Sequence, residues 1–385
     1  MSRGMTERVV VVCAGDDPPA QWSASVFLAG PTPRSAEVPS WRPGAVAAIT
    51  AGWTGPGTLV VFVPEPADGV WPDYTHQRTW ELRWGDRCDV VLFWIPRGPG
   101  MPALTTNDEF GRWKDSGRVV LGTPPEAESV RYQRAYAKDN GIPTADTLAD
   151  TIDLALAELA GGVDREGGLR FVPLRVWRTE AFRRWRTTVE RSGNEVVDAA
   201  QVWVFPGSGP VVFWALRVSM WVAAEDRVKS GEVVLSRPDL ASVVAYLPGR
   251  TPHETEVVLV REFRPSARTA DGFVLELPGG SHQAVIEPVA LAALEFGEET
   301  GLVVAAERLV AHTSRQLGAT MSTHRQAVFS VRLTEAEMAG LRGAPPVADG
   351  TEVTYPVVWR VGDLFADGSA DWTTLGAVAE VLLGS

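Results

Sequence analysis

The first 160 residues alternate short apolar runs with amphipathic stretches. Runs typical of buried strands occupy 9–13, 25–29, 58–63, 89–95 and 118–121, and helical patterns occupy 44–52, 74–87, 107–114, 127–139 and 146–159. Apolar strands that are separated by helices are typical of parallel βαβ units. The pattern therefore predicts an α/β domain built on a parallel sheet with flanking helices.

The pattern changes in the second part of the chain. Long strand-like runs follow one another at 195–205, 211–222, 240–247 and 256–263, and a helix at 287–300, strands at 303–313 and 325–333, and terminal helices come after them. This order favours a mixed sheet with helices packed on it. The polar, glycine-rich run AGGVDREGG lies between the two parts. We therefore predict domains at 1–160 and 170–385, joined by a linker at 161–169.

Composition narrows the class of protein. A length of 385 residues fits two domains, and 45% hydrophobic residues with 22% charged residues is typical of a globular chain. No apolar run approaches the roughly 18 residues that span a bilayer, so we expect no membrane partner. The net charge of −12 argues against duplex nucleic acid, whose binding depends on neutralising phosphates. Two cysteines, Cys13 and Cys88, favour a reducing cytoplasm.

One segment runs against the acidic character of the chain. Residues 170–191 carry seven arginines among several aromatic residues. This composition is found on surfaces that bind single-stranded nucleic acid, and it is also found on helices whose aromatic face packs on a sheet. Because the whole chain is acidic, we favour the packed helix.

A group of glutamates marks the second domain. The run ELPGG at 276–280 is followed by LEFGEETGL at 294–302, where Glu295, Glu298 and Glu299 fall on one helix face. Like charges at this spacing cost about 0.2–0.5 kcal/mol per pair. A bound Mg²⁺ or Mn²⁺ would remove the repulsion, and the Pro-Gly-Gly turn allows backbone carbonyls to approach the same ion. The alternative is a solvated acidic face.

These two runs together resemble the Nudix hydrolase box. The chain departs from that box where Ile286 replaces a glutamate and Leu294 replaces an arginine. An apolar pair can replace a buried ion pair without loss of stability. We therefore interpret both changes as one structural exchange that leaves the metal carboxylates in place.

The run EVVLVREFRPSARTADGFVLELPGGS resembles the ADP-ribose and nucleotide-sugar branch of the Nudix family. The resemblance implies an α/β/α sandwich with a mixed sheet and metal-dependent cleavage of a diphosphate. It implies Glu295 and Glu299 as the main metal ligands and Glu298 as a third ligand or a base. It further implies a later ligand, for which Glu352 is the candidate, and substrate contacts from Arg261, Arg264 and Glu276.

Polar residues follow two of the predicted parallel strands. The run SVFLAGP ends in Gly30 and Pro31, and TTNDEFG carries Asn107 and Glu109 at a predicted helix start. Ligands of open parallel sheets bind at the carboxyl ends of the strands, so we expect these four residues at one cleft. A carboxylate in a helix's first turn is otherwise only a favourable partner of the helix dipole.

The runs FLAGP, TTNDEFG and RVVLGTP together resemble the nucleoside 2-deoxyribosyltransferase family, which includes nucleotide N-glycosidases. The resemblance implies a flavodoxin-like fold, with Glu109 as the nucleophile that attacks the sugar C1′ and Gly30 in the sugar-binding turn. It also implies a second acid near the substrate. Asp89 matches it in the motif, and Glu81 on the preceding helix is the alternative.

The two resemblances together predict a bifunctional enzyme that acts on small nucleosides or nucleotides. Diphosphate cleavage would give a nucleoside monophosphate, from which the first domain could release the base. One alternative is a nucleotide or ADP-ribose sensor with no turnover, which the changes at Ile286 and Leu294 favour. Another alternative has one active domain and one scaffold. The sequence leaves a monomer and a homodimer both open.

Overall fold

The computed structural model describes residues 8–33, 37–67, 73–282, 286–349 and 352–383. The chain divides into two compact units, Met1–Ser236 and Arg237–Ser385. No helix in these described ranges is long and apolar enough to cross a membrane.

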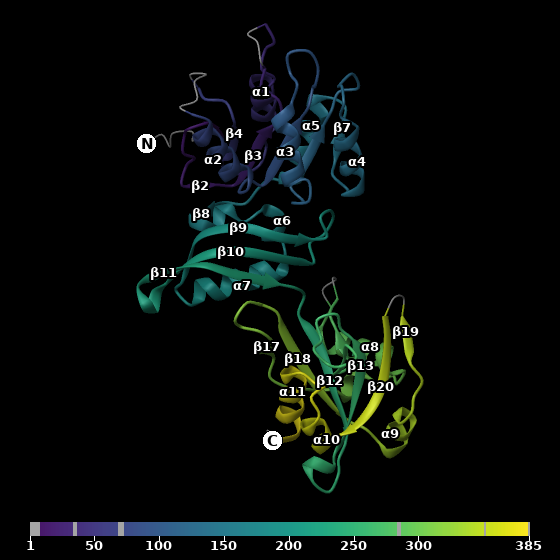
Figure 1. Cartoon of the computed structure of the whole chain (residues 1–385). Coiled ribbons are helices and arrows are strands. Elements are labelled where there is room, and N and C mark those ends of the chain that lie inside the picture. Colours follow the sequence, from purple (N-terminus) through teal and green to yellow (C-terminus); the bar gives the residue numbers. More distant parts are fainter. Residues whose placement is uncertain (1–7, 34–36, 68–72, 283–285, 350–351, 384–385) are drawn as a thin grey trace. The chain divides into compact units, whose positions relative to one another are not determined.

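A parallel sheet forms the centre of the first unit (Figure 1). Its order is β1-β4-β3-β5-β6-β7, and all neighbouring strands are parallel. The strands are β1 (Val9–Cys13), β3 (Ala24–Ala29), β4 (Leu59–Val63), β5 (Val90–Trp94), β6 (Val119–Gly122) and β7 (Thr144–Ala145). From β3 onward this is the flavodoxin-like order, with β1 added beside β4. The predicted parallel sheet is confirmed.

Helices cover both faces of this sheet because its strands are apolar on both sides. Helices α1 (Arg42–Gly52) and α5 (Leu148–Leu159) pack on one face, against residues such as Val26 and Leu92. The opposite face, with Phe27 and Val91, packs against the other three helices. These are α2 (Tyr74–Gly85), α3 (Leu104–Trp113) and α4 (Arg131–Asp139).

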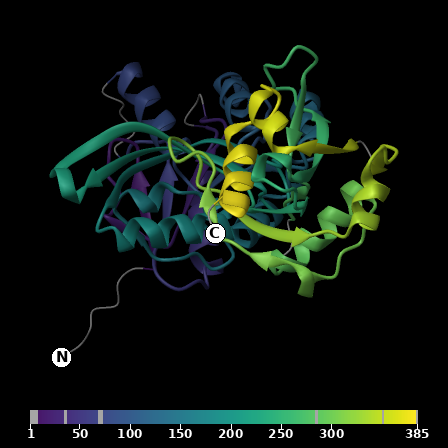
Figure 2. The same ribbon diagram turned by 90° about the horizontal axis from the view of Figure 1, so that it is seen from below.

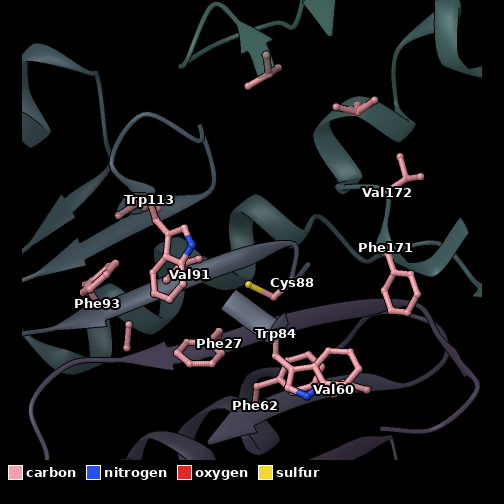
Figure 3. Packing of buried hydrophobic residues seen from close by; sticks show 14 of the residues in the cluster. Phe27, Val60, Phe62, Trp84, Cys88, Val91, Phe93, Trp113, Phe171 and Val172 are labelled. Atoms are coloured by element: carbon pink, nitrogen blue, oxygen red, sulfur yellow. The ribbon is translucent and has the colours of Figure 1, made fainter. Parts of the chain in front are cut away.

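Aromatic side chains fill the core beneath α2 and α3 (Figure 3). The Trp84 ring stacks on Phe62 with centroids 4.9 Å apart, and Trp113 meets Phe27 at 5.7 Å. Each aromatic ring buries a large apolar area, so these contacts fix both helices on the sheet. The two helices carry the acidic residues of the candidate cleft.

The expected linker is instead part of the first unit. It contains strand β8 (Arg165–Glu166), which pairs with β2 (Gln21–Trp22), and the Arg165 side chain is buried. Beyond it lie a short 3₁₀ turn, Gly167–Phe171, and α6 (Leu174–Trp177). The first compact unit consequently ends at Ser236, and the boundary expected near residue 165 is corrected.

An antiparallel sheet completes the first unit. Its strands β9 (Glu195–Phe205), β10 (Phe213–Val222) and β11 (Arg227–Ser236) lie in the order β11-β10-β9. The arginine-rich helix α7 (Glu180–Arg191) lies along it in both views (Figures 1 and 2). Phe182 and Trp185 contact Trp214, while Glu180 pairs with Arg183 and Arg184. The predicted packing of the aromatic face is therefore confirmed.

The second unit contains a mixed sheet in the order β16-β18-β12-β13-β20-β19. Strand β12 is parallel to β18 and antiparallel to β13, which is antiparallel to β20. The strands are β12 (Leu240–Leu247), β13 (Glu256–Phe263), β16 (Val310–Ala311), β18 (Arg325–Arg332), β19 (Val347–Asp349) and β20 (Glu352–Arg360). Short strands β14 (Phe273–Glu276), β15 (Gly279–Gly280) and β17 (Arg315–Gln316) pair with β13, β12 and β18.

Helices pack on both faces of this sheet. Val243 and Val258 face α8 (Pro288–Thr300) and α9 (Glu335–Leu341), whereas Val244 and Val257 face α10 (Val361–Ala366) and α11 (Trp372–Leu383). Neighbouring residues of a strand point to opposite faces, so one strand supplies both cores. The predicted mixed sheet is confirmed for the strands at 240–247, 256–263 and 325–333, whereas the predicted strands 195–205 and 211–222 belong to the separate antiparallel sheet of the first unit. The strand predicted at 303–313 is wrong, because this stretch holds a 3₁₀ turn, Ala306–Arg308, and only the short β16.

Candidate functional site

The chain reverses direction across the first sheet between β3 and β5. It leaves β3 for β4 on one side and returns to β5 on the other. Gly30 lies at the carboxyl end of β3 with φ of 141°, and a Cβ there would collide with the Trp94 carbonyl oxygen at the end of β5. Only glycine allows the two strand ends to approach this closely. This crevice is the position where open α/β sheets bind ligands.

A buried ion pair lies at the edge of the crevice. Arg42 at the start of α1 contacts Glu65 with Nη1 and Oε1 2.6 Å apart, and 2% of the arginine side chain is exposed. Arg42 also donates from Nη2 to the Gly30 carbonyl at 2.6 Å. Burial lowers the pKa of the guanidinium, and the charge of Glu65 opposes that shift. Glu65 lies two residues after the end of β4, so both residues belong to the carboxyl side of the sheet.

Two further carboxylates, which come from different helices, interact electrostatically with Arg42. Glu81 on α2 and Glu109 on α3 are both half-buried. Burial is the largest cause that raises the pKa of Glu109 to about 8, and the Glu81 charge adds to it. Burial likewise raises the pKa of Glu81, which accepts a hydrogen bond from Gln77 Nε2 at 3.0 Å. The charge of Arg42 opposes the shift of both carboxylates.

Glu109 lies deeper in its helix than the sequence predicts. Helix α3 begins at Leu104, and its N-cap Ala103 has left-handed backbone angles and no side-chain cap. Glu109 therefore falls in the second turn, and no acidic residue occupies the first turn. Because the helix dipole acts mainly within the first turn, it does not account for this buried carboxylate.

The other expected cleft residues have structural partners. The Pro31 carbonyl accepts hydrogen bonds from Trp41 Nε1 at 3.1 Å and from Arg42 Nη1 at 3.4 Å. The Asn107 amide oxygen accepts from Arg97 Nη2 at 2.5 Å and from Gln133 Nε2 at 2.6 Å. Pro31 thus fixes the turn after β3, and Asn107 connects α3 to α4.

Asp89 does not join the crevice, which corrects the expectation for this residue. It precedes β5 and so lies at the amino end of the sheet. It is buried and pairs with Arg165 at 2.6 Å, and it accepts the backbone N–H groups of Ser25 and Leu174. Its oxygens are held by this network, so Asp89 is a core residue. Glu81 is the carboxylate that accompanies Glu109.

A second group of carboxylates lies in the second unit, beside β15. Glu299 Oε2 accepts the Gly279 N–H at 2.8 Å, and a Cβ at Gly280 would collide with the Glu295 carboxylate. Glu295 and Glu299 therefore converge on the Gly279–Gly280 turn, as the spacing predicts. Burial raises the pKa of Glu299 to about 8, and the charges of Glu295 and Glu262 raise it further.

An arginine bridges two other glutamates near this turn. Arg264 Nη1 lies 2.7 Å from Glu262, and Arg264 Nη2 lies 2.7 Å from Glu276. Glu262 is buried, whereas 40% of the Arg264 side chain is exposed. The guanidinium is thus fixed from two sides and still reaches solvent. Arg264 and Glu276 lie together, as expected of a substrate-binding pair.

The remaining predicted residues of this unit lie elsewhere. Arg261 pairs with Asp271 at 2.5 Å and lies over the Phe273 ring at 4.0 Å. It precedes Glu262 in β13 and so points to the opposite face, away from Arg264. Glu298 is exposed and does not share the buried face of its neighbours. Glu352 opens β20, and its side chain lies outside the described residues.

The two departures from the predicted box do not form an apolar pair. Ile286 packs against the core below α8, but 46% of Leu294 is exposed. A residue with half its surface in water does not replace a buried arginine. The interpretation of Ile286 and Leu294 as a paired exchange is therefore wrong.

The carboxylates in the described ranges offer a metal ion a small set of protein ligands. No group of three or more acidic, histidine or cysteine residues within these ranges is arranged around one metal position. Mg²⁺ commonly takes only one or two carboxylates and keeps several waters. The convergence of Glu295 and Glu299 on one turn fits that smaller ligand set.

Comparison with known protein families gives a match within the first unit. A family model described as nucleoside 2-deoxyribosyltransferase like matches residues 23–127. This stretch runs from β3 to the loop before α4 and includes Gly30, Glu81 and Glu109. The chain thus contains a nucleoside 2-deoxyribosyltransferase-like domain. No curated protein matches the chain.

Three charged residues of these sites were not predicted. Arg42, Glu65 and Glu262 each belong to an ion pair in which one partner is buried. Glu65 follows an apolar strand, as Gly30 does, so the rule that placed Gly30 also indicates Glu65. Arg42 was missed because its partner Glu65 lies 23 residues further along the chain, whereas Glu262 pairs with Arg264 only two residues away and was not considered.

Proposed function

We propose that the first unit cleaves or transfers the N-glycosidic bond of a nucleoside, with Glu109 as nucleophile and Glu81 as the acid. The observation that carries this proposal is the electrostatic coupling of two half-buried carboxylates from separate helices at the crevice between β3 and β5. The family match supports glycosyl transfer as the reaction class. Glycosidic cleavage commonly uses two such carboxylates in different protonation states.

The reaction proceeds in two balanced steps. The Glu109 carboxylate attacks C1′, the bond from C1′ to the base breaks, and the base nitrogen takes the proton of Glu81. The product is a glycosyl ester on Glu109. Water or a second base then attacks C1′, gives its proton to Glu81 and releases Glu109.

The raised pKa of Glu109 predicts a pH dependence for the first step. With a pKa of about 8, Glu109 is mostly protonated in the empty crevice near neutral pH. This differs from the simple expectation that the nucleophile is ionised. We expect the first step to accelerate as the pH rises toward 8, because Glu109 must lose its proton before it attacks C1′.

The charges also favour the substrate class. Three carboxylates, Glu65, Glu81 and Glu109, act on the single guanidinium of Arg42. The N–H groups of Arg42 are directed at protein acceptors, so the cation is already engaged. An uncharged nucleoside at the reacting carbon suits this environment better than a phosphate does.

A second proposal concerns the second unit, where we infer Mg²⁺-dependent hydrolysis of a nucleoside diphosphate derivative of the Nudix type. The convergence of Glu295 and Glu299 on the Gly279–Gly280 turn favours it. These two residues would hold the ion, which neutralises charge and acidifies a water when it is bound. Glu299 must lose its proton to act as a ligand. Arg264, held between two glutamates and partly exposed, can contact a phosphate.

One experiment tests both proposals. A panel of nucleosides, nucleotides and nucleotide sugars is incubated with the full chain, with and without Mg²⁺, and free base and monophosphate are measured separately. We expect free base from nucleosides under both conditions and monophosphate only with Mg²⁺. No free base from any nucleoside would overturn the first proposal. No monophosphate under either condition would overturn the second and favour a sensor without turnover.

A further inference from the structure

Arg42 holds the turn after β3 through several hydrogen bonds. It donates from Nε to the Leu28 carbonyl at 3.1 Å, from Nη2 to the Gly30 carbonyl at 2.6 Å and from Nη1 to the Thr32 hydroxyl at 3.2 Å. All three acceptors belong to the end of β3 or the turn that follows it. A guanidinium carries five N–H donors spread over three nitrogens, whereas an ammonium group carries three donors on one nitrogen and reaches less widely separated acceptors.

The same guanidinium interacts electrostatically with the crevice carboxylates. It contacts Glu65 directly and also acts on Glu109 and Glu81. Two other titratable groups interact with these carboxylates: Asp108 acts on Glu109, and Glu65 contributes to the raised pKa of the Cys13 thiol, which stays neutral. The positive charge of Arg42 therefore acts on three carboxylates, which belong to the segment after β4 (Glu65), to α2 (Glu81) and to α3 (Glu109).

We propose that Arg42 is a positioning residue that fixes the turn after β3 and divides its charge between Glu65 and the Glu81–Glu109 pair. The negative charge of Glu65 determines how strongly the ion pair as a whole favours ionisation of Glu81 and Glu109. The inference rests on the proposed glycosidic function of the first unit. It assigns a role to Arg42 and Glu65 although neither touches the reacting bond.

The division of charge has opposite consequences for the two members of the ion pair. Without the negative charge of Glu65, which opposes that of Arg42, the net potential at Glu81 and Glu109 becomes more positive and favours their ionised forms. Without the charge of Arg42, both carboxylates are left with only like-charged neighbours, which disfavours ionisation. A purely structural ion pair would give the same loss of stability from either side and no opposite effect.

The test compares Glu65→Gln, Arg42→Gln and Arg42→Lys with the wild type, and Glu158→Gln serves as the matched control. Glu158 is an exposed residue of α5, so its substitution removes one charge outside the crevice. The pH dependence of base release is measured for each protein. The ionisation of Glu109 is followed independently by carbon NMR of carboxyl-labelled glutamate, and Glu109→Gln identifies the signal.

We expect Glu65→Gln to lower the pKa of Glu109 by about 0.5–1 unit and Arg42→Gln to raise it by about 1 unit. Arg42→Lys should leave that pKa within about 0.3 unit of the wild type and raise KM about tenfold, because the turn loses its hydrogen bonds. Glu158→Gln should change neither quantity.

Shifts of Glu65→Gln and Arg42→Gln in the same direction, or no shift in Glu65→Gln, would overturn the inference. If Arg42→Gln does not fold, the Glu65→Gln shift alone decides in the same way. The NMR titration needs no turnover. An enzyme that releases no base but shows the opposite shifts would refute the glycosidic function and retain the charge division.

Discussion

The two units each bury a pair of glutamates, and they compensate the charge in different ways. Glu109 and Glu299 both have a pKa raised to about 8, with burial as the largest cause. Beside Glu109, the compensating group is the buried guanidinium of Arg42. Beside Glu299, it is the Gly279 N–H, while Arg264 lies between two other glutamates.

This difference bears on what each site requires. The first pair carries its own cation within the fold, so ionisation of one carboxylate does not depend on an added ion. The second pair has a backbone dipole and an arginine that is already shared. A bound divalent cation would compensate the negative charge of the Glu295–Glu299 pair more fully than these two groups do. We therefore expect the first activity to be independent of Mg²⁺ and the second to depend on it.

The largest expected effect is the loss of the first activity in Glu109→Gln. Removing the nucleophile should lower base release by at least about 10³-fold and leave phosphate chemistry unchanged. Glu158→Gln, at an exposed position of α5, is the control and should stay close to the wild type. Steady-state assays of both products check this. Equal losses in both variants would show that the Glu109 carboxylate has no specific role.

Asp89 separates the core from the crevice in the same unit. Arg165→Ala leaves the buried Asp89 carboxylate without its partner and should destabilise the first unit by about 3–5 kcal/mol. Urea unfolding followed by tryptophan fluorescence measures this. Asp89→Asn should also lower stability yet retain the kcat of the folded fraction. A wild-type stability with a large drop in kcat would return Asp89 to the active site.

In the second unit, Glu299→Gln should lower Mg²⁺-dependent hydrolysis by at least about 10²-fold, because an ion ligand and its charge are lost. Glu298→Gln should cause a smaller loss, since that side chain is exposed. Release of monophosphate measures both, and base release provides the internal control. Unchanged turnover in Glu299→Gln would contradict the assignment of the second site.

Stability should fall as the pH rises across the neutral range. The pKa of Glu109 and of Glu299 is raised from 4.5 to about 8, so the folded state holds more protons in this interval. Each group therefore stabilises the fold below pH 4.5, relative to alkaline pH, and loses this contribution as the pH approaches 8. We expect the free energy of unfolding of each compact unit to fall by on the order of 1–2 kcal/mol per pH unit, measured from urea midpoints. Glutamine at either position should flatten the decline in its own unit. An unchanged slope would contradict the raised values.

The smallest effect is expected at Leu294. Because 46% of this residue is exposed, Leu294→Arg should change the stability by less than about 0.5 kcal/mol. Ile286→Ala provides the contrast, since Ile286 packs against the core and should cost more. Thermal unfolding of both variants checks the ranking. A large loss of stability in Leu294→Arg would instead support the buried apolar pair of Ile286 and Leu294.

The sequence predicted the parts of the sites that depend on local spacing. Glu295 and Glu299 lie one helical turn apart, and Gly30 follows an apolar strand, so periodicity and strand ends were sufficient. The helix start at Leu104 was missed because Ala103 begins the helix without a capping side chain. Asp89 was assigned from its motif match, although it opens the strand predicted at 89–95 and so belongs to the amino end of the sheet.

The missing parts depend on contacts between distant residues. Arg42 and Glu65 are separated by a helix and a strand, and the fold alone brings them together. The boundary at Ser236 was missed for the same reason, since Arg165 in the apparent linker pairs with Asp89. A glycine-rich polar run resembles a linker whether or not a buried arginine lies inside it.

The most direct test of the central claim is to trap the glycosyl ester on Glu109. The full chain is incubated with a nucleoside that carries fluorine at C2′, which slows the second step, and its peptides are analysed by mass spectrometry. The account predicts a sugar adduct on the peptide that contains Glu109 and none in Glu109→Gln. An adduct on another peptide, or base release from this analogue at the rate of the natural nucleoside with no adduct, would contradict it.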